Sequence, residues 1–272
     1  MKDALVAIAA FFGPKELLQK VLGPTAEYLG LGIRDWTKKR VDNVATILHK
    51  AQTRIDDASG ESLSSAVSPQ LLRTVLEFGS YTEDALIQEY LAGLLFSARR
   101  GRTGDGRSAA LGMLLENLSS YEVRFHYLIY HTVRKLYTGT PSNVGLAGVR
   151  DQLQTYFAMS VFHSAVLAPD GNDSEFLNSI VESSVYGLLR HGLVSPNLVF
   201  GSPQHIKQTC IGGEVPDYGI VLQPSILGIE LYLWIGGVGS RTHSSMFLNK
   251  DILIPDLVDL PFDERLIFRY PT

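Results

Sequence analysis

The sequence predicts a mainly α-helical fold with a small α+β unit in its second half, and three observations lead to this prediction. Apolar residues recur in steps of three and four over most of the first half, which is the period of one helix face. Helix-start signals, Ser-Pro or Ser followed three residues later by Glu, recur along the chain. From residue 174 the order becomes helix, glycine stop, strand, loop, strand and helix. This order is typical of a winged helix, so we expect an N-terminal helical region followed by a winged-helix-like unit.

The first predicted helices lie between residues 15 and 57. Pro14 and Pro24 are suited to the first turn of a helix, and they separate a short helix over residues 15–22 from a longer one over residues 23–57. The apolar stripe of the longer helix consists of Leu29, Ile33, Trp36, Val44, Ile47, Leu48, Ala51 and Ile55. A small polar linker, residues 59–65, follows this amphipathic helix.

Two further helices are predicted before residue 100. Ser68 and Pro69 are suited to the N-cap and the first turn of a helix that runs to about Glu77. Residues 80–83, Ser-Tyr-Thr-Glu, have the spacing of a capping box and predict a helix that runs to Arg99. The glycine-rich, basic segment that follows predicts a loop.

The second half begins with another capping box, Ser119–Glu122, which predicts a helix after it. Residues 146–167 are also predicted to be helical. Asp173 or Ser174 would cap the next helix, which ends at Gly192. Two strands and a last helix are predicted at residues 198–200, 219–222 and 225–234. We therefore expect a helical region with a long amphipathic helix (1–110), a helical and winged-helix-like region (111–240) and an extended C-terminal tail (241–272).

Composition limits the class of protein. Of the 272 residues, 45% are apolar and 19% are charged, which is too apolar for a disordered chain. One cysteine, Cys210, excludes an internal disulfide framework and fits a reducing compartment. The apolar run over residues 4–12 is too short to span a membrane and no signal-peptide cleavage site follows it. We therefore expect a cytoplasmic protein without a transmembrane segment.

Three stretches of the chain carry a resemblance to a known family. They comprise Gly23–Gly30 through Asp35–Thr37 and on to Ala51, Val67–Leu72 with Glu89–Leu95, and Leu118–Glu122 with Leu188–Val194 followed by Pro224–Gly228. Together they resemble the Abi-alpha family, bacterial proteins associated with abortive phage infection. The resemblance extends in order over roughly residues 15–235, whereas the segment after Arg100 and the tail after Gly239 depart from it.

The resemblance implies a role in antiphage defence, including a form of defence that sacrifices the infected cell. It brings no catalytic motif that transfers residue by residue. We accordingly expect no catalytic residues, no metal and no cofactor, while the existence of an enzymatic activity stays an open question. The resemblance implies a biological role and no mechanism, and we expect the chain to act through a protein partner or through self-association.

Two basic clusters are the candidate sites for an anionic or protein partner. Their residues are Arg34, Lys38, Lys39, Arg40, Arg99, Arg100, Arg102 and Arg107. The first cluster lies on the long helix, where it either faces nucleic acid or anionic lipid or forms a solvated face opposite the apolar stripe. The second cluster could hold phosphate or an acidic partner. Residues 101–108 also have the spacing of a phosphate-binding P-loop, but a helix and not a strand is predicted before them.

Two other residue pairs contain the residue types that are found in metal sites or in catalytic sites. Glu122 and His126 are spaced like metal ligands on a helix, but Glu122 already belongs to the capping box and no third ligand is apparent. Cys210 and His205 are the types of a nucleophile and its base, although a lone cysteine beside glycines is more often a small buried residue. We therefore predict neither a metal site nor a catalytic pair.

Charge is distributed unevenly between the two halves. Residues 1–110 hold 14 basic and 13 acidic side chains, and residues 111–272 hold 10 and 15, for a total formal charge of −4. A DNA-binding winged helix normally carries the positive charge, so this balance disfavours nucleic acid as a partner without excluding it. Residues 226–238 are apolar except for Glu230. They predict a fully buried helix, or alternatively a surface for a partner subunit or for transient membrane contact.

The function expected from the sequence is antiphage defence through protein or anion contacts and without identifiable catalysis. Two alternatives from other classes stay open. One is a winged-helix regulator that binds nucleic acid. The other is a hydrolase or nuclease whose active site the sequence does not reveal.

Overall fold

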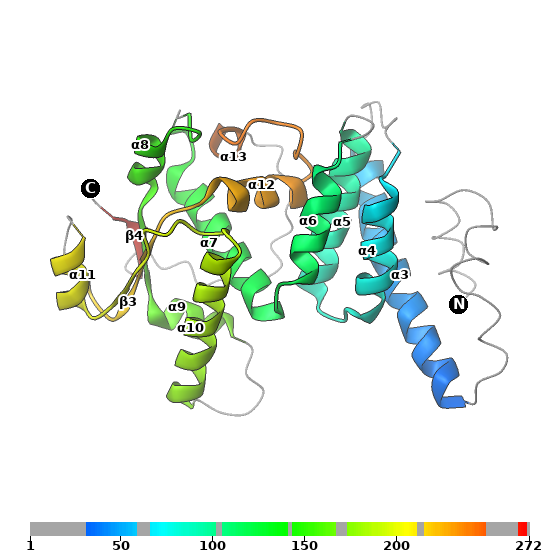
Figure 1. Ribbon diagram of the computed structural model, residues 1–272, viewed down its shortest axis with the longest axis horizontal. Helices are drawn as coiled ribbons and strands as arrows, with labels where there is room; N and C mark the ends of the chain where they lie inside the picture. The colour runs from blue at the N-terminus through cyan, green and yellow to red at the C-terminus, as the bar shows by residue number, and fades with distance from the viewer. Residues whose placement is uncertain are drawn as a thin grey trace. The chain divides into compact units, whose positions relative to one another are not determined.

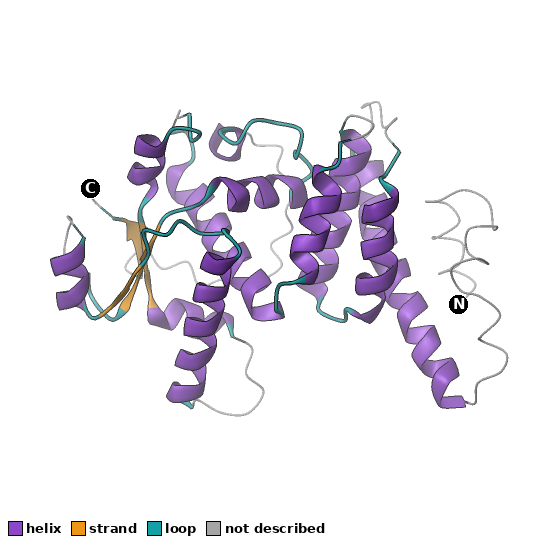
Figure 2. Cartoon of the chain, in the orientation of Figure 1, coloured by secondary structure: helices purple, strands orange, loops and turns teal. Residues whose placement is uncertain are grey.

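The computed structural model describes residues 31–58, 66–101, 105–140, 143–166, 173–210, 215–248 and 266–270, with side chains from residue 38 onward (Figure 1). The chain forms two compact units. Unit 1 contains residues 1–117 and 237–240, and unit 2 contains residues 118–236 and 241–272. Helices α3 to α13 and one four-stranded sheet make up the described part (Figure 2), which confirms a mainly α fold with a small α+β unit.

Unit 1 is built from long helices that pack around a central one. Its described helices are α3 (Leu31–Asp57), α4 (Pro69–Tyr81), α5 (Ala85–Arg100) and α6 (Arg107–Glu116). Helix α3 packs against α4 and α5, and α6 packs against the same two helices. Residues 86–98 of α5 are all buried, so this helix forms the centre of the unit.

Short polar signals start the helices of unit 1, although not always at the predicted residue. Ser68 is the N-cap of α4 and Pro69 lies in its first turn, as predicted. The capping box predicted at residues 80–83 is wrong, because α4 continues to Tyr81 and Asp84 caps α5 instead. The Asp84 carboxylate accepts hydrogen bonds from two N–H groups of the first turn, which the Ser80 hydroxyl would not do.

Unit 2 is organised around α7 (Ser120–Tyr137), against which four other helices pack. Those four are α9 (Met159–Ala165), α10 (Ser174–Arg190), α12 (Ile226–Ile235) and α13 (Ser245–Leu248). The short α8 (Ala147–Arg150), the 3-10 helix η2 (Asp151–Leu153) and α11 (Pro203–Thr209) complete its described helices. The predicted capping box Ser119–Glu122 starts α7, and Asp173, one of the two predicted N-caps, starts α10.

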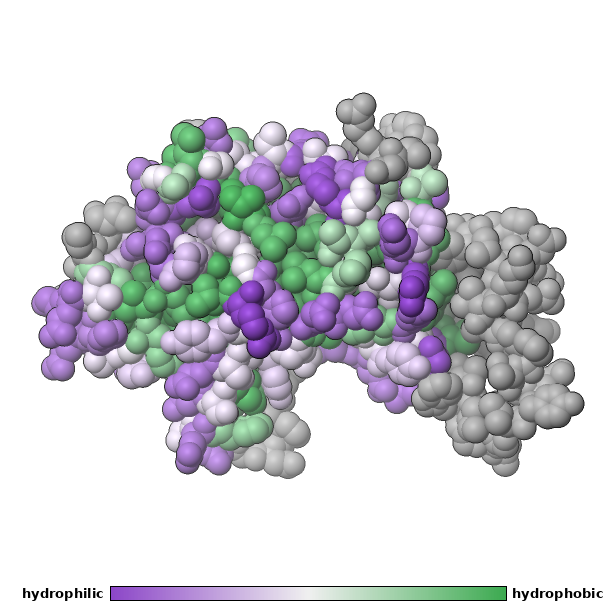
Figure 3. Space-filling view, viewed as in Figure 1, coloured by the Kyte–Doolittle hydropathy of each residue, from purple (hydrophilic) through white to green (hydrophobic). Residues whose placement is uncertain are grey.

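The sheet of unit 2 is antiparallel, with the strand order β2-β3-β1-β4. Its strands are β1 (Thr155–Ala158), β2 (Val199–Gly201), β3 (Gly219–Leu222) and β4 (Ile267–Arg269). Strands β2 and β3 and helix α12 lie where the winged-helix pattern predicts them. Helix α11 lies in the connection between β2 and β3. Ile206 is its one buried residue, and hydrophilic side chains cover its outer surface (Figure 3).

Two predictions about unit 2 are wrong. The helix predicted over residues 146–167 is interrupted by β1, whose four residues are all buried. Such a central strand shows no alternation of polar and apolar residues, and its β-branched and aromatic side chains favour an extended chain. The tail after residue 240 is not uniformly extended either, because it contributes α13 and the edge strand β4.

Several sequence predictions fall outside the described residues. These are the short helix at 15–22, the first turns of the helix at 23–57 and the linker at 59–65. Among the helices that are described, no helix has both the length and the apolar composition that a membrane span requires.

Candidate functional site

The first predicted basic cluster lies on α3, and two of its described members, Lys39 and Arg40, contact the end of α4 and the residues just before α5. Lys39 forms an ion pair with Glu83 at 2.6 Å. Arg40 donates a hydrogen bond from Nε to the Ser80 hydroxyl at 3.0 Å, and its guanidinium lies 4.1 Å from the centre of the Tyr81 ring. Lys38 is exposed, and the side chain of Arg34 is not among those described. Arg40 therefore helps to hold α3 against the end of α4.

The second predicted cluster is held in a similar way by its own chain. Arg100 donates a hydrogen bond to the carbonyl oxygen of Gly237 at 2.8 Å, within unit 1. Arg107 forms a two-pronged pair with Asp105, with Nη2 lying 2.7 Å from Oδ2, and the neighbouring guanidinium lowers the pKa of this carboxyl group. Arg99 is partly buried in the last turn of α5, and Arg102 lies outside the described residues. The structure does not bring the two clusters together into one described anion site.

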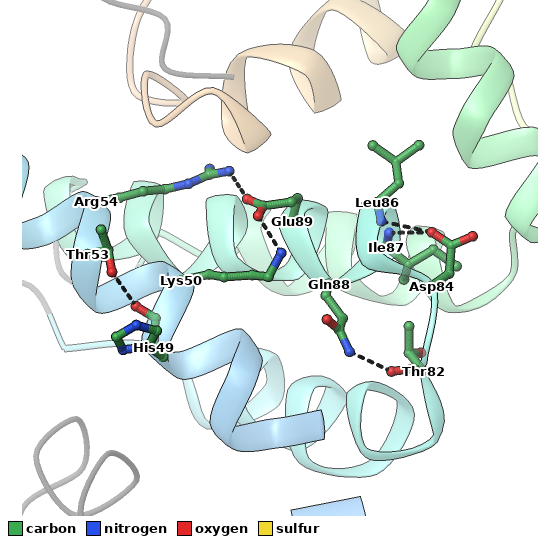
Figure 4. Close-up of polar contacts among 10 residues, drawn as sticks. All are labelled: His49, Lys50, Thr53, Arg54, Thr82, Asp84, Leu86, Ile87, Gln88 and Glu89. Atoms are coloured by element: carbon green, nitrogen blue, oxygen red, sulfur yellow. Dashed lines mark hydrogen bonds and ion pairs between the residues drawn. The ribbon is translucent and has the colours of Figure 1, made fainter. Parts of the chain in front are cut away.

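A different charged cluster is buried between α3 and α5 (Figure 4). Glu89 on α5 accepts from two cations of α3: its Oε1 lies 2.5 Å from Lys50 Nζ, and its Oε2 lies 2.5 Å from Arg54 Nη2. The exposed fractions of the Glu89 and Arg54 side chains are 10% and 9%, and that of Lys50 is 24%. One carboxylate thus joins two successive turns of α3 to the central helix of the unit.

Burial dominates the electrostatics of this cluster. Desolvation lowers the pKa of Arg54 from its ordinary value, and the interaction with Glu89 opposes that shift. A buried charge without its counter-ion would be strongly unfavourable, so the three groups depend on one another. Nearby, the Gln88 amide donates to the Thr82 carbonyl at 2.9 Å, which further fixes the start of α5 (Figure 4).

Unit 2 contains a second buried polar cluster, centred on Tyr130 of α7. The Tyr130 hydroxyl donates to the carbonyl of Leu193 at 2.6 Å and accepts from the N–H of Ser225 at 3.0 Å. Ser225 in turn caps α12, since its side chain accepts from the N–H of Gly228 at 3.0 Å. His126, one turn before Tyr130, bonds the Gly228 carbonyl through Nε2 at 3.1 Å, and the two rings stack. Helix α7, the end of α10 and the start of α12 are therefore joined at a single point.

The cluster in unit 2 is uncharged. Burial lowers the pKa of His126 to about 3, and a carbonyl partner requires the hydrogen on Nε2. Burial likewise raises the pKa of Tyr130, so its hydroxyl stays protonated. A neutral histidine and a neutral tyrosine that bond backbone groups are typical of a structural cluster, and they leave neither ring available to a substrate.

His126 makes the stability of unit 2 depend on pH. Because its folded-state pKa of about 3 lies below the ordinary 6.5, the unfolded chain binds a proton over this interval and the folded chain does not. Stability is therefore complete above pH 6.5 and falls as the pH decreases. We expect a loss of about 2 kcal/mol from this residue between pH 7 and pH 5.

Urea unfolding at the two pH values, in the native chain and in His126→Gln, measures this contribution. Glutamine retains an N–H for the Gly228 carbonyl but does not titrate, so the difference between pH 7 and pH 5 should shrink in the variant by about 2 kcal/mol. Equal differences in both proteins would contradict a buried, neutral His126.

The other residue pairs considered in the sequence serve the fold. Glu122 is the reciprocal residue of its capping box, with Oε2 accepting from the Ser119 N–H at 2.6 Å, while His126 bonds a backbone carbonyl. Within the described ranges, no group of three or more His, Cys, Asp or Glu residues could hold a metal ion. Cys210 is the C-cap of α11, and burial raises the pKa of its thiol, whereas a nucleophilic cysteine needs a lowered one.

Two further predictions from sequence have clear outcomes. The segment before Gly101 is the helix α5, as predicted, and a phosphate-binding P-loop would need a strand there. In the apolar segment 226–238, residues 228, 229 and 231–238 are buried, which favours the fully buried helix over the alternative of an exposed partner or membrane surface.

Sequence reasoning missed the polar partners at the centre of both units. Glu89 and Tyr130 lie within strongly apolar helical patterns, and a polar group inside such a pattern signals a buried bond whose partner is unknown. The partners of Glu89 are 35 and 39 residues away from it in the sequence, and those of Tyr130 are 63 and 95 residues away. No protein family, curated protein or solved structure matches this chain in comparisons of sequence and structure.

Proposed function

We propose that this chain is a bacterial antiphage protein of the abortive-infection type, which acts through contacts with other proteins and not through catalysis. The proposal rests on the resemblance to the Abi-alpha family. The observation that supports it best is that the stretches carrying this resemblance meet in the buried clusters. Lys50 of the first stretch pairs with Glu89 of the second, and Leu193 and Ser225 of the third both bond Tyr130.

This pattern explains why those stretches contain no catalytic motif. Residues that cap helices and join them to one another maintain the fold, and they are required independently of the function of the protein surface. The function then depends on the outer surface, where several large side chains are exposed on helices and on loops. These exposed residues are Tyr81, Met113, Leu146, Phe176, Tyr186, Tyr218 and Leu248.

The two alternative functions have less support. A nucleic-acid-binding regulator needs cations directed at phosphates, whereas Lys39, Arg40, Arg100 and Arg107 all contact groups of their own chain. A hydrolase or nuclease needs an acid, a base or a metal. Among the described residues, the groups with the most strongly shifted pKa values are His126, Tyr130, Tyr137 and Tyr156, and each of them bonds a backbone carbonyl instead.

A phage challenge of cells that express the chain tests the proposal. We expect protection at low multiplicity of infection and collapse of the culture at high multiplicity, because abortive defence sacrifices infected cells. Lys38→Glu, which reverses an exposed charge of the basic cluster, should protect as well as the native chain if phosphate contacts are not involved. No protection against a broad phage panel, with the native neighbouring genes present, would contradict the proposal.

A further inference from the structure

One helix of unit 2, α10, has an outer face whose residues complement one another. Its inner face is buried against α7 and α9, through residues such as Leu177, Val181 and Leu188. Its outer face is exposed at positions 175, 176, 179, 182, 183, 186 and 190. Two of these residues are large and aromatic: Phe176 and Tyr186 have 51% and 54% of their surface exposed.

The spacing on this outer face is that of a helix-pairing seam. Phe176, Ser179, Ser183, Tyr186 and Arg190 follow one another in steps of three, four, three and four residues. Steps of this kind keep side chains on one narrow stripe, which is the arrangement found where two helices pack side by side. The stripe runs from Phe176 to Arg190, so it extends over about 21 Å at 1.5 Å per residue.

We infer that two copies of this chain associate through α10, with the two helices antiparallel and related by a two-fold axis. If the helices cross midway between Ser179 and Ser183, Ser179 of one copy faces Ser183 of the other. Phe176 of each copy then faces Tyr186 of its neighbour. Small side chains at the crossing let the two backbones approach closely, and an aromatic pair on each side fills the remaining space.

Charge identifies the occupant of this face as a second copy. The N-terminal end of α10 is acidic, with Asp173 as the N-cap and Glu175 in the first turn, and the last turn carries Arg190. Antiparallel pairing brings Arg190 of each copy beside the acidic N-terminal end of α10 in the other copy. The two-fold axis therefore produces two equivalent contacts of this kind. A parallel arrangement would instead place like charges together. The outer face of α10, which includes Glu175 and Arg190, therefore supplies both halves of a complementary surface.

Arg190 is available for this contact. Its side chain is 72% exposed, and its ion pair with Glu122 inside unit 2 is long, at 3.7 Å. The area that a single helix pair buries is at the low end for specific interfaces, so the dimer dissociates on dilution. This inference does not depend on the role in phage defence, because association is measured on the purified chain alone.

Sedimentation velocity of the full chain, over a range of concentrations, tests the inference. We expect a monomer–dimer equilibrium, and a monomer at every concentration overturns the proposal. Tyr186→Ala should raise the dissociation constant at least about tenfold, since both copies lose an aromatic contact. Tyr81→Ala removes a similarly exposed tyrosine (59%) from unit 1 and should leave the dissociation constant of the dimer unchanged. An equal effect of both substitutions, or no effect of Tyr186→Ala, overturns the proposal.

Exchange of charges tests the antiparallel arrangement itself. Glu175→Arg alone and Arg190→Glu alone each bring like charges together, and each should weaken the dimer about tenfold. In a mixture of the two variants, the introduced arginine meets the introduced glutamate, and native Glu175 meets native Arg190. Mixed dimers should therefore recover the native affinity. If the mixture dissociates as readily as either variant by itself, while circular dichroism shows both to be folded, the antiparallel pairing is wrong.

Discussion

Replacement of Gly228 by alanine is expected to be among the most destabilising single changes in unit 2. A Cβ atom at this position would lie 2.0 Å from the Tyr130 hydroxyl and 2.5 Å from the Leu193 carbonyl oxygen. Neither group can withdraw, because each is bonded to the other and Tyr130 also accepts from the N–H of Ser225. The methyl group must therefore break the buried cluster or displace the start of α12.

We expect a loss of about 3 kcal/mol in the free energy of unfolding, from overpacking together with the loss of buried hydrogen bonds. For a unit of this size the melting temperature should fall by roughly 6–12 °C. Gly148→Ala provides the matched control, because no atom lies within 4 Å of its Cβ position. Thermal unfolding by circular dichroism measures both variants. Equal melting temperatures would show that the Tyr130 cluster tolerates displacement.

Substitution of Glu89 by glutamine is expected to have a comparable effect on unit 1. The change retains the shape of the side chain but removes the negative charge that Lys50 and Arg54 share at 2.5 Å each. Arg54 then loses the carboxylate that lies 2.5 Å from its guanidinium, and the removal of one partner of a buried ion pair is strongly destabilising. We expect a loss of about 3 kcal/mol in the free energy of unfolding of the unit.

The matched control is Glu83→Gln. This residue pairs with Lys39 at a similar distance, but both side chains are about 60% exposed, and such pairs contribute less than about 1 kcal/mol. Urea unfolding measures the two variants, and hydrogen exchange assigns the weakened amides. In Glu89→Gln these amides should belong to α3 and α5. If both substitutions lower the free energy of unfolding by the same amount, burial does not determine how much the Glu89 cluster stabilises the unit.

Much of the fold could be predicted from sequence because helix starts depend on adjacent residues. Ser68 and Ser119 cap the helices that they were predicted to start, and Asp173 is one of the two caps predicted for α10. Ser225, predicted as the first helical residue, is the N-cap of α12, and each capping bond spans two or three residues. The error at Ser80 has the same local cause. Two acceptable caps, Ser80 and Asp84, stand four residues apart, and the choice between them depends on where α4 ends.

The parts that could not be predicted depend on residues that are distant in the chain. Strand β1 is recognisable as a strand only through its neighbours, because Thr155 pairs with Leu222 on one side and with Arg269 on the other. The buried clusters have the same character. Nothing near Glu89 or Tyr130 in the sequence reveals the residues that they bond, so their chemistry emerges only in the folded chain.

The contact between Arg100 and Gly237 has a consequence for how this protein can change over evolutionary time. The short segment 237–240 belongs to unit 1, although the residues on both sides of it belong to unit 2. No single cut in the chain separates the two units, since a fragment that ends at residue 117 lacks the carbonyl to which Arg100 donates. A Cβ at Gly237 would lie 2.4 Å from the Phe96 ring, so only glycine is accommodated at this position of the segment. Recombination at one crossover point cannot transplant unit 1 intact, and the two units are therefore inherited as one module.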